Sequence, residues 1–177
     1  MSFKQDFGRF YERIRGNIFE LARECQFEPT KQQASLMHAY RNDQRLPPGE
    51  RKRRYATKSG QGTGKTTVST LIGLDRALLD VGSMVVVTAP TMRQCTDVWI
   101  AELRRLLGQA NPMLRRFIEI YNTSVVIGGV RDWGIRCVTA TRPENMQGYH
   151  QKFLTFILEE ASGIDRPIWQ QIKGTLS

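Results

Sequence analysis

The segment Ser59–Thr67 combines the residue types that bind phosphate groups. It reads SGQGTGKTT, in which three alternating glycines are followed directly by Lys65 and two threonines. Glycines let the backbone curl so that successive N–H groups point at phosphate oxygens, and a following helix adds the positive end of its dipole. A lysine at this place reaches the β and γ phosphates, and the next hydroxyl can bind Mg²⁺. The segment therefore predicts a site for a nucleotide and its metal ion.

This segment fits the phosphate-loop template G-x-x-x-x-G-K-[ST] except at its first position, where Ser59 stands in place of glycine. The alternative is a Gly/Ser turn that merely joins a strand to a helix. The surroundings favour the nucleotide, because RYAT before the loop predicts a strand and apolar residues at helical spacing after it predict a helix. The residues predicted to bind ATP are Ser59, Gly60, Gln61, Gly62, Thr63, Gly64, Lys65, Thr66 and Thr67, with Thr66 also a ligand of Mg²⁺.

Two carboxylates follow the last apolar run of the sequence, FLTFIL. Glu159 and Glu160 stand at the carboxyl end of this predicted strand, where open α/β sheets place their ligand sites. Successive residues of a strand face opposite ways, so Glu159 is predicted to face the metal and Glu160 to act as the general base. Asp is usual at the first position, and Glu is one methylene longer. Without the glycine loop, two charges ending a strand would be the better interpretation; with it, we predict that Glu160 and Lys65 are catalytic.

The elements that must position these residues form an α/β pattern. From RYATKS onward, short apolar strands alternate with helices, which predicts a P-loop NTPase fold with a mostly parallel sheet and helices on both faces. The segments on either side of YNT and GGVRDWG could instead form an antiparallel hairpin at its edge. Helical segments precede the core, so we divide the chain into a helical part, residues 1–50, and an ATPase core, residues 51–177.

The first helical segment has one apolar stripe, formed by Phe3, Phe7, Phe10, Ile14, Ile18 and Leu21. Their spacing of three and four predicts a helix that packs on something. Packing on the chain's own core is the preferred interpretation, and a partner surface is the alternative. A second helix is predicted from Lys31 to about Tyr40, before NDQRLPPGE breaks it.

The balance of charges favours an anionic partner. The sequence has 26 Lys and Arg against 17 Asp and Glu, a net charge of +9. The densest basic run, Arg51–Arg54, is either a solvated loop or a contact to a nucleic-acid backbone. Three widely spaced cysteines predict neither a disulfide framework nor a zinc site. No apolar stretch is long enough to cross a bilayer, so we expect a soluble, intracellular protein without a membrane partner.

Taken in order, five segments resemble the ATPase domain of the large terminase subunit, the motor that packages DNA into tailed-phage capsids. These are FEPTKQQASLMHAY, SGQGTGKTT, VVVTAPTMRQCTDVWIAEL, RPENMQGYH and FILEEASGIDRPIWQQIKGTLS. The resemblance implies hydrolysis of ATP with Mg²⁺ to move double-stranded DNA into a procapsid. It also implies a homo-oligomeric ring, the portal and the small terminase subunit as partners, and action in the cytoplasm of the host cell.

The resemblance also implies roles for single residues. Gln33, with Gln32 as the fallback, would recognise adenine. In TAPTMRQC, Thr91 and Arg93 could touch DNA phosphate and Gln94 the nucleotide, while a helix N-cap is an equally favoured role for Thr91. In the family an arginine often stands where this sequence has Gln147, so Arg142 is the nearest candidate for an arginine acting on a neighbouring subunit. His150 is expected to position its loop.

The end of the sequence departs from the family. There another strand, with a coupling motif, and a nuclease domain follow, whereas this sequence ends 17 residues after Glu160. The resemblance thus implies an amino-terminal part of the motor, ending after the Walker B region and without nuclease activity. Two alternatives stay open: a helicase-like DNA-dependent ATPase, and a module that binds nucleotide and DNA without turnover. A small-molecule kinase is disfavoured because the acidic strand lies far from the loop.

Overall fold

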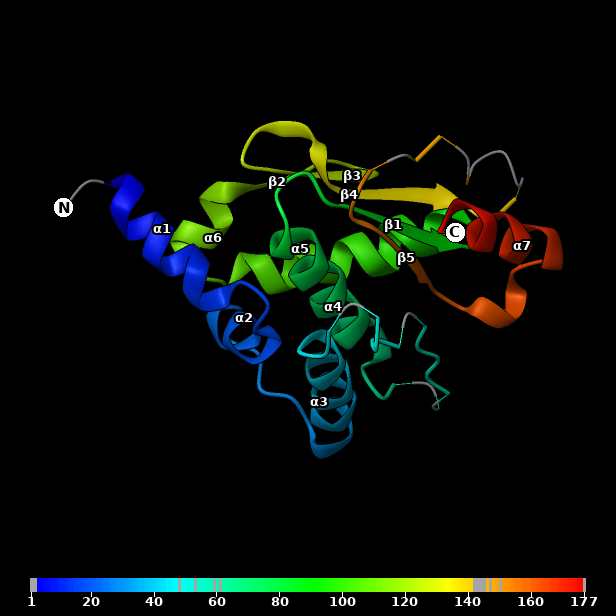
Figure 1. The fold of residues 1–177 in the computed structure, drawn as a ribbon, viewed down its shortest axis with the longest axis horizontal. Helices are drawn as coiled ribbons and strands as arrows, with labels where there is room; N and C mark the ends of the chain where they lie inside the picture. Colours follow the sequence, from blue (N-terminus) through cyan, green and yellow to red (C-terminus); the bar gives the residue numbers. More distant parts are fainter. Residues whose placement is uncertain are drawn as a thin grey trace.

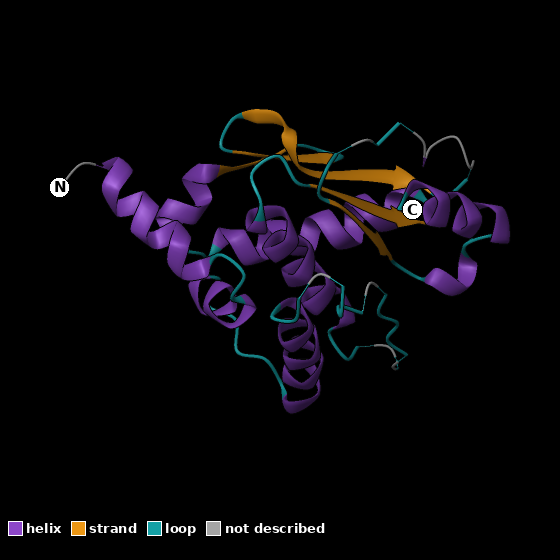
Figure 2. Cartoon of the chain, viewed as in Figure 1, coloured by secondary structure: helices purple, strands orange, loops and turns teal. Residues whose placement is uncertain are grey.

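The chain folds into an α/β structure (Figures 1 and 2), here a computed structural model. It describes residues 3–47, 49–52, 54–58, 60, 62–141, 146, 148–149 and 151–176. Three helices come first: α1 (Phe3–Ile14), α2 (Ile18–Glu24) and α3 (Lys31–Gln44). The remaining elements are α4 (Lys65–Leu79), β1 (Met84–Ala89), the π-helical η1 (Gln94–Ile100), α5 (Ala101–Gly108), α6 (Pro112–Phe117), β2 (Ile118–Ile120), β3 (Ser124–Ile127), β4 (Val130–Thr139), β5 (Leu154–Leu158), the 3₁₀ turn η3 (Ala161–Gly163) and α7 (Arg166–Thr175).

The described strands form one sheet in the order β2-β3-β4-β1-β5. Strand β1 is parallel to both neighbours, and its Val86 pairs with Arg136 of β4 and Phe156 of β5. Strands β2, β3 and β4 are antiparallel. Gly128 and Gly129, both with positive φ, form the two-residue turn between β3 and β4, a geometry that favours a hairpin. The α/β class is confirmed, but the sheet is mixed, with the hairpin arrangement at its edge.

The strand predicted for RYAT does not form, so this prediction is wrong. Residues 54–58 have no regular secondary structure and are exposed. The segment is attached to α3 and not to the sheet, because the Asp43 carboxylate accepts hydrogen bonds from the backbone N–H of Lys52, at 2.6 Å, and from the hydroxyl of Tyr55. The Tyr55 ring also packs edge-on to Tyr40, with the ring centres 6.5 Å apart.

The main core lies between one face of the sheet and helices α4, η1 and α5. Val85, Val87 and Ala89 of β1 contribute to it, and the apolar residues of α4 face them. The first two helices pack on the far side of α4, burying Phe10, Ile14, Ile18 and Leu21. The Tyr11 hydroxyl donates to the Leu78 carbonyl oxygen at 2.6 Å, at the end of α4 where carbonyls lack helical partners. The predicted packing on the chain's own core is confirmed for these four residues, but the single predicted helix is divided into α1 and α2.

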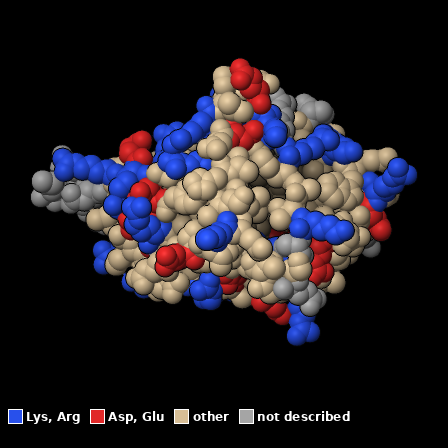
Figure 3. Space-filling view, turned by 90° about the horizontal axis from the view of Figure 1, so that it is seen from below, with Lys and Arg blue, Asp and Glu red and all other residues tan. Residues whose placement is uncertain are grey.

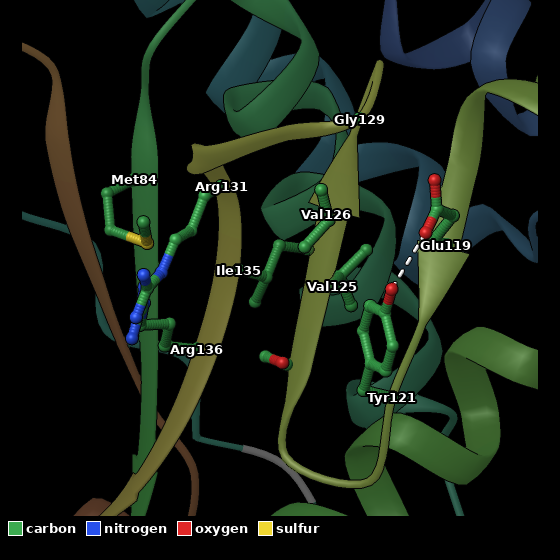
Figure 4. A pocket seen from close by; sticks show the side chains of 10 residues that line it. Met84, Glu119, Tyr121, Val125, Val126, Gly129, Arg131, Ile135 and Arg136 are labelled. Atoms are coloured by element: carbon green, nitrogen blue, oxygen red, sulfur yellow. Dashed lines mark hydrogen bonds between the residues drawn. The ribbon is translucent and has the colours of Figure 1, made fainter.

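The second face of the sheet is covered by α7 at the carboxyl ends of the parallel strands. Ile168 and Ile172 pack there against Val138, Phe156 and Leu158. Toward the amino end of β1 this face is open and forms a hollow of about 440 Å³, seen in Figure 4. Its lining includes Met84, Tyr121, Arg131 and Arg136, and the Tyr121 hydroxyl donates to Glu119 at 2.8 Å. Helices therefore lie on both faces, as predicted, but α7 covers only part of the second.

Cys25, Cys95 and Cys137 are all buried free thiols. Among the helices described, none is both long and apolar enough to span a bilayer. On the face shown in Figure 3, Lys and Arg side chains occur in several separate places, so charge on this face does not single out one interface.

A buried carboxyl group joins α3 to α4. The Tyr40 hydroxyl donates to Oδ2 of Asp75 at 2.6 Å, and both side chains are buried. Burial raises the pKa of Asp75 from 3.8 to about 6, against the smaller opposing effects of the Tyr40 hydrogen bond and the Arg76 charge. The native state thus keeps a proton that the unfolded state loses between about pH 4 and pH 6.

We therefore predict that Asp75 lowers the free energy of unfolding as the pH rises from 4 to 6. The loss should be about 2 kcal/mol, and it persists above pH 6. Asp75→Asn removes the titrating group, so urea unfolding of this variant should lack that component. Asp132→Asn, whose carboxylate is exposed, is the control and should keep it. An identical pH dependence in Asp75→Asn and the unmodified chain would refute the assignment.

Candidate nucleotide-binding site

The glycine loop leads directly into the first turn of α4. Gly62 and Gly64 both have φ of 73°, a backbone conformation that glycine adopts without strain. A Cβ atom on Gly64 would lie 2.1 Å from Nε2 of Gln33, so this position has no room for a side chain unless Gln33 moves. Within the described part of the chain, no side chain caps the N-terminus of the 15-residue α4. The positive dipole end of α4 thus faces the glycine loop without a side-chain cap, an arrangement that favours an anion.

Lys65 is folded back onto the loop. Its Nζ donates to the carbonyl oxygen of Gly60 at 3.1 Å, and the Thr63 hydroxyl donates to the same oxygen at 3.1 Å. Lys65 is exposed, and its charge also lowers the pKa of Glu159. The lysine is therefore held on the loop, and its charge acts on the acidic end of β5. Two residues predicted to bind the nucleotide, Ser59 and Gln61, lie outside the described residues.

Gln33 contacts the same loop from the first turn of α3. Its Nε2 donates to the Thr63 carbonyl oxygen at 3.2 Å, while its Oε1 accepts from the Thr30 N–H at 2.9 Å as part of a capping box. The structure thus brings Gln33 to the site. Both ends of its amide bond to the protein, so adenine recognition stays a prediction and would require these bonds to exchange. Gln32 is exposed on the same turn.

Glu159 follows β5 and faces the first turns of α4. Its backbone N–H donates to the Thr88 carbonyl oxygen at 2.9 Å, and its carboxylate accepts a hydrogen bond from the Ser69 hydroxyl. Ser69 lies three residues after Thr66, so both side chains share one face of the helix. Burial raises the pKa of Glu159, the Ser69 hydrogen bond opposes this, and the charge of Glu160 adds to it. The glycine loop and the acidic pair therefore meet at one end of the sheet.

Glu160 points to a different partner. Its backbone has φ 49° and ψ 47°, a left-handed conformation that is unusual for a residue other than glycine. Such conformations cost free energy and cluster at functional sites. Its carboxylate accepts a hydrogen bond from Nε2 of Gln94 at 2.5 Å. The two glutamates thus have separate partners, and a left-handed turn and not strand alternation separates them. Their roles as metal ligand and general base stay predictions.

Gln94 is held in place by Thr91. Its side-chain Oε1 accepts a hydrogen bond from the backbone N–H of Thr91 at 2.9 Å. The backbone N–H of Gln94 in turn donates to the Thr91 hydroxyl at 3.3 Å. These reciprocal bonds make Thr91 an N-cap, one of its two suggested roles. Arg93 is exposed and pairs with Asp97 at 3.0 Å. Gln94 therefore connects the turn after β1 to Glu160.

Three contributors were not found from the sequence: Ser69, Glu102 and Arg105. The Thr67 hydroxyl donates to Oε1 of Glu102 on α5 at 2.5 Å, across 35 residues of sequence. Arg105 binds both carboxylate oxygens of Glu102, each at 2.8 Å. A spacing of three residues between Glu102 and Arg105 is typical of a helical ion pair, but nothing in the sequence places this pair on Thr67. Arg142 and His150 lie outside the described residues.

The predicted ligands of Mg²⁺ fit that ion in type. Mg²⁺ in nucleotide sites is held by one or two protein oxygens together with phosphates and waters. Glu159, which follows β5, supplies a largely buried carboxylate. It contacts Ser69 on the face of α4 that also carries Thr66. In the described part of the chain, no group of three or more His, Cys, Asp or Glu side chains could hold a metal by itself.

Comparison with known proteins adds no assignment: no family model, curated protein or solved structure matches the chain.

Proposed function

We propose that this chain is a P-loop ATPase that binds ATP with Mg²⁺ at the segment Ser59–Thr67. One observation carries the proposal: the uncapped start of α4, Lys65 and the pair Glu159–Glu160 lie at the same end of the sheet. Donors for an anion and acceptors for a proton thus lie at the same end of the sheet. This is the arrangement that phosphoryl transfer to water requires.

Binding uses groups that the loop already positions. Lys65 exchanges the Gly60 carbonyl oxygen for the β and γ phosphates, because a charged acceptor gives a stronger hydrogen bond than a neutral carbonyl. The first N–H groups of α4 donate to phosphate oxygens. Mg²⁺, held by Thr66 and Glu159, would neutralise phosphate charge. Thr67 is next to the same helix end and can turn its hydroxyl toward the nucleotide.

Hydrolysis needs a base beside the attacking water. Glu160 accepts a proton as the water oxygen bonds to the γ phosphorus and the bond from that phosphorus to the β–γ bridging oxygen breaks, giving ADP and phosphate. Gln94 holds the Glu160 carboxylate through an N–H donor, which fixes its direction. Lys65 offsets the negative charge that the leaving ADP gains.

The motor role is the finer part of the proposal. Its support is the resemblance of five ordered segments to large terminase subunits, together with the charge of +9. Arg45, Lys52, Arg54 and Lys58 are exposed around the segment that precedes the loop, where they suit contacts to a DNA backbone. We propose double-stranded DNA as the substrate that is moved, with a ring of subunits, a portal and a small terminase subunit as partners.

A second candidate function has its own observation. Residues 54–58 do not pair with the sheet, so no strand precedes the glycine loop directly, and helix α4 follows it. A chain in this state could bind nucleotide without turning it over. Release of phosphate from ATP, measured with and without duplex DNA, separates the two candidates. Turnover that duplex DNA stimulates supports the motor, whereas binding without turnover supports the second function.

Replacing Gln94 tests whether it positions Glu160. We predict that Gln94→Ala lowers kcat about tenfold and leaves KM nearly unchanged, since an oriented base matters in the transition state more than in the bound substrate. Steady-state kinetics of Gln94→Ala and of the unmodified chain measures both constants. Gln109→Ala, exposed at the end of the adjoining helix, is the control. A rise in KM with an unaltered kcat would show that Gln94 acts on binding instead.

A further inference from the structure

An ion pair on α5 reaches the helix end of the proposed nucleotide site. The Glu102 carboxylate accepts a hydrogen bond from the Thr67 hydroxyl at 2.5 Å. The Arg105 guanidinium donates to both carboxylate oxygens of Glu102, each at 2.8 Å. Thr67 belongs to the first turn of α4, directly after Lys65 and Thr66. The mechanism above uses neither Glu102 nor Arg105. Glu102 nevertheless contacts the Thr67 side chain directly, and Arg105 contacts Glu102.

The two charges have opposite effects on an anion at this place. The Glu102 side chain is 17% exposed, so water screens its charge only in part, whereas Arg105 is 51% exposed. The Arg105 hydrogen bonds lower the pKa of Glu102, so its carboxylate stays ionised at neutral pH. A carboxylate beside Thr67 repels phosphate, while the guanidinium beside it attracts phosphate.

The hydroxyl of Thr67 also has one proton to donate. In this structure it donates that proton to Glu102 and not to the space in front of the helix. A phosphate oxygen in the loop would compete for the same donor. Glu102 therefore opposes the binding of phosphate twice, through its charge and through its hold on Thr67.

We propose that the Glu102–Arg105 pair sets the affinity of the loop for nucleotide: Glu102 holds Thr67 when no phosphate is bound, and Arg105 offsets the Glu102 charge when it is. The inference rests on the proposed function. The continuous helix η1–α5 contacts the site at two places, because Gln94 at its start binds Glu160 and Glu102 binds Thr67. When Glu102 releases Thr67, the change would act on the same helix whose Gln94 orients Glu160.

The proposal predicts changes of opposite sign. Glu102→Gln removes the charge and keeps the size of the side chain, so it should tighten the binding of a fluorescent ATP analogue with Mg²⁺ roughly fivefold. Arg105→Ala leaves the carboxylate uncompensated and should weaken binding by a similar factor. Equilibrium titrations at low and moderate salt measure both, and the two effects should shrink as salt rises.

A matched pair of controls is available on α2. Arg23 pairs with Glu20 at 2.9 Å with the same spacing of three residues, so Glu20→Gln and Arg23→Ala change the same charges elsewhere. Neither should alter nucleotide affinity, and thermal unfolding checks that every variant folds. If both α5 variants weaken binding, or neither changes it, this inference fails while the proposed function stands. If the unmodified chain binds no ATP analogue, the proposed function fails and the inference with it.

Discussion

Lys65→Ala should abolish ATP hydrolysis and weaken ATP binding by about 100-fold. Lys65 is the one cation of the loop that directly follows its last glycine, and it reaches both the loop and the acidic strand end. Losing a charge-assisted hydrogen bond to phosphate costs about 1.5 to 3 kcal/mol, and the transition state, with more charge on its oxygens, loses more. Titration with a fluorescent ATP analogue and an assay of phosphate release measure the two effects separately.

Lys58→Ala is the matched control for this variant. Lys58 is exposed in the segment before the loop, and the Lys58→Ala variant removes the same charge from a residue that is not assigned to ATP binding. This variant should keep ATP binding within about twofold, because solvent screens an exposed charge. Equal losses in Lys58→Ala and Lys65→Ala would mean that general positive charge, not the loop, attracts the nucleotide.

Glu160→Gln should separate binding from chemistry. Glutamine has the size of glutamate but cannot accept the proton of the attacking water, so kcat should fall about 1000-fold, within the range for loss of a general base. ATP affinity should stay the same or rise, since one negative charge near the phosphates is removed. Single-turnover hydrolysis together with an ATP titration measures this.

The neighbouring carboxylate provides the comparison. Glu159→Gln, at the residue assigned to the metal, should raise the Mg²⁺ concentration needed for half-maximal activity, whereas Glu160→Gln should leave that requirement unchanged. Glu50→Gln, exposed in the loop after α3, should alter neither quantity. A Glu160→Gln variant that hydrolyses ATP at the normal rate would exclude Glu160 as the base.

Patterns that repeat along the chain predicted much of the fold. The stripe containing Phe10, Ile14 and Leu21 predicted packing on the core, and the structure confirms it. The apolar run FLTFIL predicted a strand, and it forms β5, which pairs in parallel with the buried β1. Trp99, Leu103 and Leu106 recur at helical spacing in the sequence, and all three are buried in the helix formed by η1 and α5.

What the sequence did not predict depends on contacts between distant residues. RYAT has the composition of a strand, but Asp43 binds the segment and holds it against α3. Glu102 lies 35 residues from Thr67, and Gln94 lies 66 residues from Glu160, so no local period relates them. The left-handed turn at Glu160 is likewise set by its surroundings, because glutamate has no intrinsic preference for that conformation.

Equilibrium titration of the unmodified chain with ATP, in the presence and absence of Mg²⁺ and beside the Lys65→Ala variant, tests the central claim most directly. The account predicts saturable binding of one ATP per chain that Mg²⁺ strengthens, that ADP displaces and that Lys65→Ala loses. A folded chain that binds no ATP at millimolar concentration, or that binds it equally well without Lys65, would contradict the assignment of Ser59–Thr67 as a nucleotide site.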